Sequence, residues 1–133
     1  MKKIISLLLT ILMLNLSVPV YAEEATPWYI HIIYMTESFE ISPSGIASVD
    51  ADISIRSGAY CTIAAKIQKE TASGGWSTVV TFRDTGDTYA IVEETTRLTS
   101  KGTYKCVFTF TVYDDMDFII EQKSFESQEI GYR

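Results

Sequence analysis

The sequence predicts an all-β protein, a sandwich or small barrel of seven or eight short strands. Three observations support this fold class. Apolar and polar residues alternate with a period of two in several segments, as in strands with one buried face. Residues typical of turns separate these segments at intervals of roughly 8–12 residues. No helical periodicity follows the first 22 residues.

The expected strands are rich in β-branched and aromatic residues and end at turn-forming residues. They cover 28–35, 38–41, 46–56, 59–69, 76–82, 88–92, 103–113 and 118–125. In the last but one, Tyr104 and Cys106 share the apolar face. Segment 93–100 is polar and is expected to be irregular, and the polar tail from 126 to 133 is expected to be ragged.

The first 22 residues have the features of an export signal. Two lysines precede an almost wholly apolar run from 4 to 16, and Val20-Tyr21-Ala22 fits the small-x-small rule of signal peptidase. The run is shorter than the roughly 20 residues of a membrane span, so a retained membrane anchor is the less favoured alternative. We expect a signal peptide at 1–22, a single β-sandwich domain at 23–133 and a secreted, extracellular product.

Removal of the leader would leave an acidic domain. The chain has 11 basic and 17 acidic residues, and two of the basic residues lie in the leader, so the mature part carries 9 basic residues and a net charge of −8. Such a surface repels phosphate backbones and anionic lipids. We therefore expect no nucleic-acid partner and no membrane association after cleavage. Solubility is the simpler explanation of the acidity.

The two cysteines stand in similar stretches, Ser57-Gly58-Ala59-Tyr60-Cys61 and Gly102-Thr103-Tyr104-Lys105-Cys106, with Trp76 between them. The order Cys, Trp, Cys, with a Tyr two residues before the second Cys, resembles the immunoglobulin-like β-sandwich over residues 59–113. The sequence departs from that pattern at Lys101, where Asp is usual, and at Trp76, which stands close to a turn.

The resemblance implies specific roles for these residues. It implies strand B at 59–69, C at 76–82, F at 103–113 and G at 118–125, with Trp76 and Tyr104 in the core. It also implies a Cys61–Cys106 disulfide between the sheets, which would close a loop of about 45 residues and stabilise the fold by roughly 4 kcal/mol. The alternative is a pair of reduced, buried cysteines.

The general layout is also similar to small secreted β-domain proteins of unknown function from Gram-positive bacteria. Gly75-Trp76 and Gly102-Thr103-Tyr104 carry this looser resemblance. It implies no activity.

The sequence lacks the residue patterns that catalysis uses. The one histidine, His31, lies in an apolar segment, and no serine stands in a Gly-x-Ser-x-Gly motif. The Asp-rich segment 114–117 could attract calcium, but it lacks the glycine and the spacing of a calcium loop, and Asp is common in turns. We therefore predict no catalytic residue, no cofactor and no metal site.

Three tyrosines are candidate ligand contacts: Tyr29, Tyr60 and Tyr113 fall on polar faces or at strand ends. Exposed aromatics stack on sugars or anchor protein contacts, and the alternative is packing against neighbouring polar side chains. We predict a secreted, non-enzymatic binding or interaction module for an unknown protein or glycan. The alternatives are a structural or self-assembling extracellular subunit that pairs through strand edges and, less favoured, a small secreted enzyme.

Overall fold

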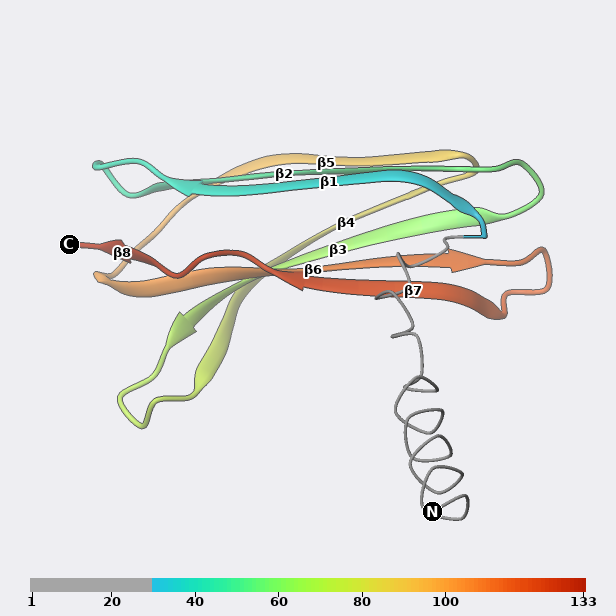
Figure 1. The fold of residues 1–133 in the computed structure, drawn as a ribbon. Helices are drawn as coiled ribbons and strands as arrows, with labels where there is room; N and C mark the ends of the chain where they lie inside the picture. The colour runs from blue at the N-terminus through green and yellow to red at the C-terminus, as the bar shows by residue number, and fades with distance from the viewer. Residues whose placement is uncertain (1–29) are drawn as a thin grey trace, which may run out of the picture.

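The computed structural model describes residues 30–133, which form two antiparallel β-sheets packed face to face (Figure 1). The strands are β1 (Ile32–Ile41), β2 (Ile46–Ile55), β3 (Tyr60–Glu70), β4 (Trp76–Gly86), β5 (Tyr89–Arg97), β6 (Gly102–Tyr113), β7 (Ile119–Glu126) and β8 (Ile130–Tyr132). Within this part of the chain, no helix has the length and hydropathy to cross a membrane. The expected signal peptide and Tyr29 lie outside the described residues.

The two antiparallel sheets confirm the predicted all-β sandwich, and their strand order is similar to that of immunoglobulin-like sandwiches. One sheet has the order β1-β2-β5, and the other has the order β4-β3-β6-β7. The short β8 pairs with the start of β6, on the side where β7 pairs further along. In Figure 1, β1, β2 and β5 form the upper layer, while β3, β6 and β7 form the lower one.

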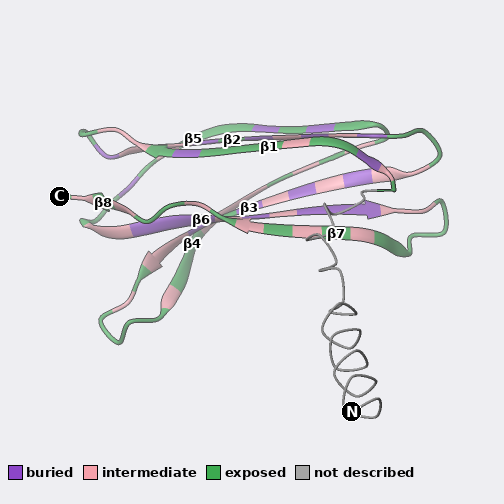
Figure 2. Cartoon of the chain, viewed as in Figure 1, coloured by how far each residue is buried: buried purple, intermediate pink, exposed green. Residues whose placement is uncertain are grey.

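The core lies between the layers and is built by the predicted alternation. In β2 every odd position from Ala47 to Ile55 is buried. In β6 the even positions from Tyr104 to Val112 are buried, and Phe108 and Phe110 are among the largest side chains wholly withdrawn from water. Figure 2 shows these buried stretches on the strands that face across the sandwich. Burial of each large apolar side chain stabilises the fold by about 1.5–3 kcal/mol.

Tyr104 lies in the core, as predicted, with 1% of its surface exposed. Its hydroxyl donates a hydrogen bond of 2.7 Å to the carbonyl oxygen of Ser100, just before β6. This bond satisfies the one polar atom of a buried tyrosine and fixes the connection from β5. It is the tyrosine-corner arrangement of immunoglobulin-like sandwiches.

The predicted disulfide is wrong, because both cysteines are free and buried. β3 and β6 are antiparallel neighbours in one sheet, where Cys61 pairs with Val112 and Cys106 pairs with Ile67. Six positions along a strand separate the two cysteines by about 20 Å, whereas a disulfide needs Cα atoms within about 7 Å.

The error has a topological cause, because segments 59–69 and 76–82 each take the place of the strand that follows the one implied by the resemblance. β2 takes the place of strand B, and segment 59–69 is strand C in the opposite sheet. Segment 76–82 accordingly takes the place that follows C, while 103–113 and 118–125 correspond to F and G.

Trp76 is not in the core, which corrects a second prediction. Val79 is an extra residue in the β3–β4 ladder, since Ile67 pairs with Val80 and Gln68 pairs with Thr78. Such a bulge breaks the alternation, so that residues before Val79 face the opposite way from that expected by counting back from Val80 and Phe82. The half-exposed Trp76 ring therefore lies on the outer face, where the Lys105 ammonium sits 4.3 Å from its centre. That ammonium also pairs with Glu126 at 3.1 Å.

Backbone pairing extends the strands beyond the predicted limits. Polar residues 93–97 belong to β5, because the outer face of its sheet carries polar side chains. Near the C-terminus the Ser127 hydroxyl accepts the N–H of Cys106 at 2.8 Å, and the Ser127 N–H donates to the Cys106 carbonyl at 2.9 Å. The tail is therefore ordered, and its Ile130 and Tyr132 pack against the core.

Candidate functional site

The β6–β7 hairpin projects from one end of the sandwich, seen at the right of Figure 1. The β2–β3 and β4–β5 connections run at the same end, because residues 58–59 and 87–88 line one recess together with Asp115 of the hairpin. Three connections from both sheets thus build this end, which we call the hairpin end.

The turn at 114–118 is fixed by a network around Asp114. The Asp114 N–H donates to the Phe118 carbonyl at 2.9 Å, and the Asp117 N–H donates to the Asp114 carbonyl at 3.2 Å. The Asp114 carboxylate also accepts the N–H groups of Met116 and Phe118, both at 2.9 Å. These four hydrogen bonds limit the freedom of the turn to change its backbone conformation.

Asp117 connects this turn to the sheet. It has a left-handed backbone with φ of 65°, which is unfavourable for a residue with a side chain. Its carboxylate accepts a hydrogen bond of 2.7 Å from the Tyr60 hydroxyl. This bond is the main reason that the pKa of Tyr60 is raised to about 12.

The predicted contact residues Tyr60 and Tyr113 lie side by side below the turn. They pair across β3 and β6, and their rings stack with centres 4.8 Å apart and planes inclined by 11°. Each ring thereby covers part of the other, and Tyr60 also holds Asp117. The structure thus brings two of the three predicted tyrosines together in a supporting position, and Tyr29 lies outside the described residues.

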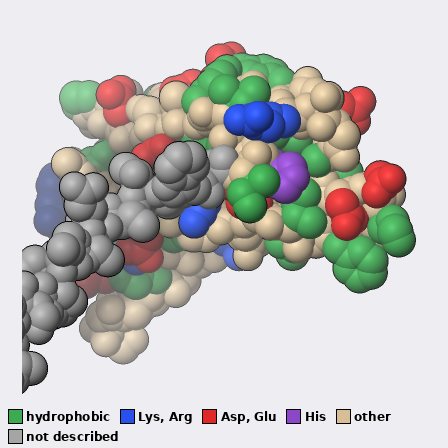
Figure 3. All heavy atoms as spheres, turned by 45° about the vertical axis from the view of Figure 1, so that its right-hand side comes forward, with side chains coloured by type: hydrophobic (Ala, Val, Ile, Leu, Met, Phe, Trp, Pro, Cys, Tyr) green, Lys and Arg blue, Asp and Glu red, His purple; other side chains and the backbone are tan. Residues whose placement is uncertain are grey.

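Three exposed apolar side chains lie at the β6–β7 turn of the hairpin end. Met116 is 67% exposed, Phe118 64% and Ile119 56%. We call these three residues the apolar tip. In Figure 3 apolar and acidic side chains adjoin at the right of the molecule, over this end. The tip was not among the residues predicted from the sequence, although Met and Phe are unusual in an Asp-rich turn.

A recess of about 410 Å³ adjoins the tip, and it is lined by Gly58, Ala59, Tyr60, Asp87, Thr88 and Asp115. Asp87 and Asp115 come from different connections and are both exposed. The two ion pairs found within residues 30–133 are His31–Glu121 and Lys105–Glu126. Neither recess carboxylate has a cationic partner in this part of the chain.

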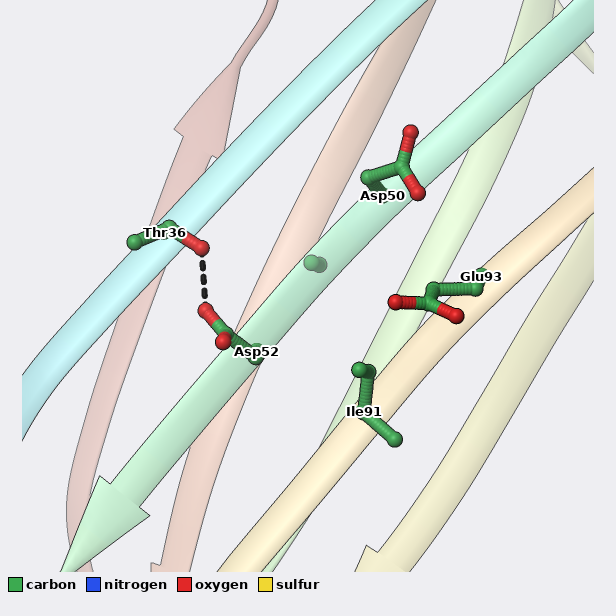
Figure 4. A pocket seen from close by; sticks show the side chains of 6 residues that line it. Thr36, Asp50, Asp52, Ile91 and Glu93 are labelled. Carbon is green, nitrogen blue, oxygen red and sulfur yellow. Dashed lines mark hydrogen bonds between the residues drawn. The ribbon is translucent and has the colours of Figure 1, made fainter.

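The outer face of the β1-β2-β5 sheet carries a smaller hollow of about 160 Å³, shown in Figure 4. Asp50 and Asp52 on β2 and Glu93 on β5 point into it, and the Thr36 hydroxyl donates a hydrogen bond to Asp52. Among the described residues, no three His, Cys, Asp or Glu side chains are placed to hold a metal ion.

The histidine and the two cysteines, the side chains with possible catalytic chemistry, make contacts that hold the fold together or are buried in its core. The His31 N–H donates to the Glu121 carboxylate at 3.0 Å, and its ring nitrogen Nδ1 lies 3.4 Å from the same oxygen. These contacts attach the start of β1 to β7. Burial raises the pKa of the Cys106 thiol to about 12 and also raises that of Cys61, which disfavours the reactive thiolate.

The hairpin end therefore offers apolar contact area, two carboxylates that have no cationic partner among residues 30–133, and a stacked pair of tyrosines as its base. The chain matches no protein-family model, no curated protein and no solved structure.

Proposed function

We propose that the chain is a secreted, non-enzymatic binding module that contacts a partner protein through the apolar tip at its hairpin end. One observation carries the proposal: the side chains of Met116, Phe118 and Ile119 are exposed to solvent. Hydrogen bonds to the Asp114 carboxylate fix the backbone of the turn in the conformation that exposes them. Exposed apolar groups that cluster on a rigid support are typical of interaction surfaces.

Two other turns of the molecule show that this exposure is not required by the backbone. The turns at 42–46 and 71–75 have the same pattern of backbone hydrogen bonds as the turn at 114–118. At the place of Met116 they carry Ser44 and Ser73, whose hydroxyls bond to the first side chain of the turn. At the place of Asp117 they carry glycines. The polar version of this turn is therefore available to the chain, and the hairpin end departs from it.

A protein is a better partner for this surface than a glycan. Sugars stack on open aromatic faces, but the rings of Tyr60 and Tyr113 stack on each other. The side chains that project are Met116 and Phe118, of the types that are enriched in the centres of protein interfaces. The loops at one end also form the binding surface of immunoglobulin variable domains, and the proposal extends the resemblance to that use.

Self-assembly through strand edges is less favoured. Three of the four edge strands, β1, β4 and β7, are each interrupted by one extra residue, namely Ile33, Val79 and Ile120. The fourth edge strand, β5, has no such interruption. Glu37 of β1 pairs with the buried Ala51 and so stands on the core-facing side of an edge strand. Bulges and inward charges on edge strands hinder pairing between chains.

The test compares two double variants on arrays of extracellular proteins and of glycans. Met116→Ser/Phe118→Ser removes the two most exposed side chains of the tip, and Val79→Ser/Ile91→Ser removes two exposed apolar side chains elsewhere. Loss of central apolar contacts costs about 2 kcal/mol each, or about 4 kcal/mol for the two side chains, so proteins bound by the wild type should bind the tip variant roughly 1,000-fold more weakly and the control variant unchanged. Binding that survives the tip variant, or that involves glycans alone, would contradict the proposal.

A further inference from the structure

The recess beside the apolar tip has a recognition chemistry of its own. We propose that it receives a cationic side chain, an arginine or a lysine, that projects from the partner protein. The source of the side chain rests on the proposed function, whereas the chemistry of the recess rests on its own residues. Tyr60, Asp87 and Asp115 line it.

The carboxylates of this end divide into occupied and available groups. In the β6–β7 turn, Asp114 accepts two backbone N–H groups and Asp117 accepts the Tyr60 hydroxyl. Asp115 has neither kind of bond, and it faces the recess.

The β4–β5 connection repeats this division. Asp84 accepts the N–H of Ile91 at 2.9 Å, while Asp87 lines the recess without a hydrogen bond or an ion pair to residues 30–133. Each connection therefore contributes one available carboxylate to the same recess. Two carboxylates from different loops suit a guanidinium or ammonium group, which donates several hydrogen bonds in different directions.

The lining of the recess disfavours other occupants. Tyr60 is held by its stack on Tyr113 and by its bond to Asp117, so it keeps its place when a ligand enters. An anion would meet the two carboxylates of the recess. A metal ion is a poorer occupant, because no third acidic, histidine or cysteine ligand is placed for it in the described chain.

The recess also complements the tip. An apolar projection next to a site for positive charge fits a partner surface with an apolar depression and a neighbouring basic residue. A second copy of this chain lacks such a match at its own hairpin end, since the acidic residues would face each other.

The experiment follows backbone amide signals by NMR while Nα-acetyl-arginine amide or Nα-acetyl-lysine amide is added. Saturable shifts are expected at residues 58–59 and 87–88, and they should weaken between low and high salt. Nα-acetyl-citrulline amide, of similar shape without charge, should give none. Asp87→Asn/Asp115→Asn should weaken binding about fivefold, the effect expected from two exposed charge pairs. The control Asp50→Asn/Glu93→Gln makes the same charge change at the hollow of Figure 4 and should leave binding unchanged.

Three outcomes would overturn the inference: no saturable shift, equal shifts with citrulline amide, or equal weakening by the control pair. Shifts with calcium chloride and none with either cationic amide would assign the recess to a metal instead. The Met116→Ser/Phe118→Ser variant separates this inference from the proposed function. It should keep the affinity for the arginine amide while it loses the partner protein, so either proposal can fail without the other.

Discussion

The β3–β4 and β6–β7 hairpins have the same turn geometry, but the first turn carries small and polar side chains whereas the second exposes large apolar ones. In both, the first turn residue donates its N–H to the carbonyl four residues on, and its side-chain oxygen accepts the N–H of that residue. In both, the fourth residue is left-handed, with φ of 84° at Gly74 and 65° at Asp117. The first turn reads Thr-Ala-Ser-Gly-Gly and the second Asp-Asp-Met-Asp-Phe.

The comparison separates what the backbone needs from what the surface adds. A side-chain acceptor at the first position and tolerance of a positive φ at the fourth are enough for this turn. A Cβ at Gly74 would meet no atom within 4 Å, so the glycine there serves the backbone alone. At Asp117 the unfavourable left-handed backbone is offset by the hydrogen bond from the Tyr60 hydroxyl. Met116 has no hydroxyl, so it cannot form the hydrogen bond that Ser73 forms with Thr71.

The largest expected effect tests the pairing of β3 with β6, the neighbouring strands from which the two hairpins extend. They leave from opposite ends because β3 and β6 are antiparallel neighbours, and the same pairing keeps Cys61 and Cys106 apart. Unreduced protein should therefore contain two thiols that react with a disulfide reagent at least ~100-fold faster after unfolding than before, as buried thiols do. Mass spectrometry after alkylation in denaturant should find two modified cysteines. An intact disulfide would place these strands in facing sheets and end the comparison.

The next effect concerns the first turn position. Asp114→Ala leaves two backbone N–H groups without their acceptor, whereas Thr71→Ala leaves one. We expect the free energy of unfolding to fall by about 2 kcal/mol for Asp114→Ala and by about 1 kcal/mol for Thr71→Ala. Urea denaturation followed by circular dichroism measures both values. Equal losses would show that the two turns are held equally, without a special role for the carboxylate.

A smaller effect is expected at the fourth turn position. Gly74→Asp forces a side chain into the left-handed region and should cost about 1 kcal/mol. Asp117→Gly relieves the same cost but loses the bond to Tyr60, so these contributions should offset each other to within about 0.5 kcal/mol. Urea denaturation of both variants is the measurement. A gain at 117 as large as the loss at 74 would mean that the Tyr60–Asp117 bond contributes nothing to stability.

The sequence predicted those features that depend on alternation within a strand. The buried faces of β2, β3 and β6 follow directly from a period of two, and Tyr104 falls in the core for that reason. A single bulge makes a prediction from alternation wrong for the residues on one side of it. With Val79 left out of the ladder, Trp76 turns outward, and nothing local in the sequence marks which residue a ladder omits.

Long-range order was the other limit. The Cys, Trp and Tyr spacing was compatible with strands in two sheets or in one, because spacing along the chain does not state which strands pair. The candidate site was half predicted, since Tyr60 and Tyr113 were selected as aromatic residues at strand ends. Met116, Phe118 and the recess carboxylates become a site only when three connections meet at one end.

The smallest effect is a change with pH that only the β6–β7 turn should show. The hydrogen bond to Asp117 raises the pKa of Tyr60 from about 10 to about 12, because the neutral phenol is the form that donates. A group whose pKa is raised on folding stabilises the fold below its unfolded pKa and loses that contribution as pH rises through its folded pKa. The contribution of Tyr60 should therefore be complete below pH 10 and vanish towards pH 12.

Phenolate absorbance, measured against Tyr60→Phe, tests this pH dependence. Tyr60 should titrate at higher pH in the wild type than in Asp117→Asn, and Thr71→Ala should leave its titration unchanged. Titration of Tyr60 near its ordinary pKa in the wild type would show that the turn and the sheet are not joined at this bond.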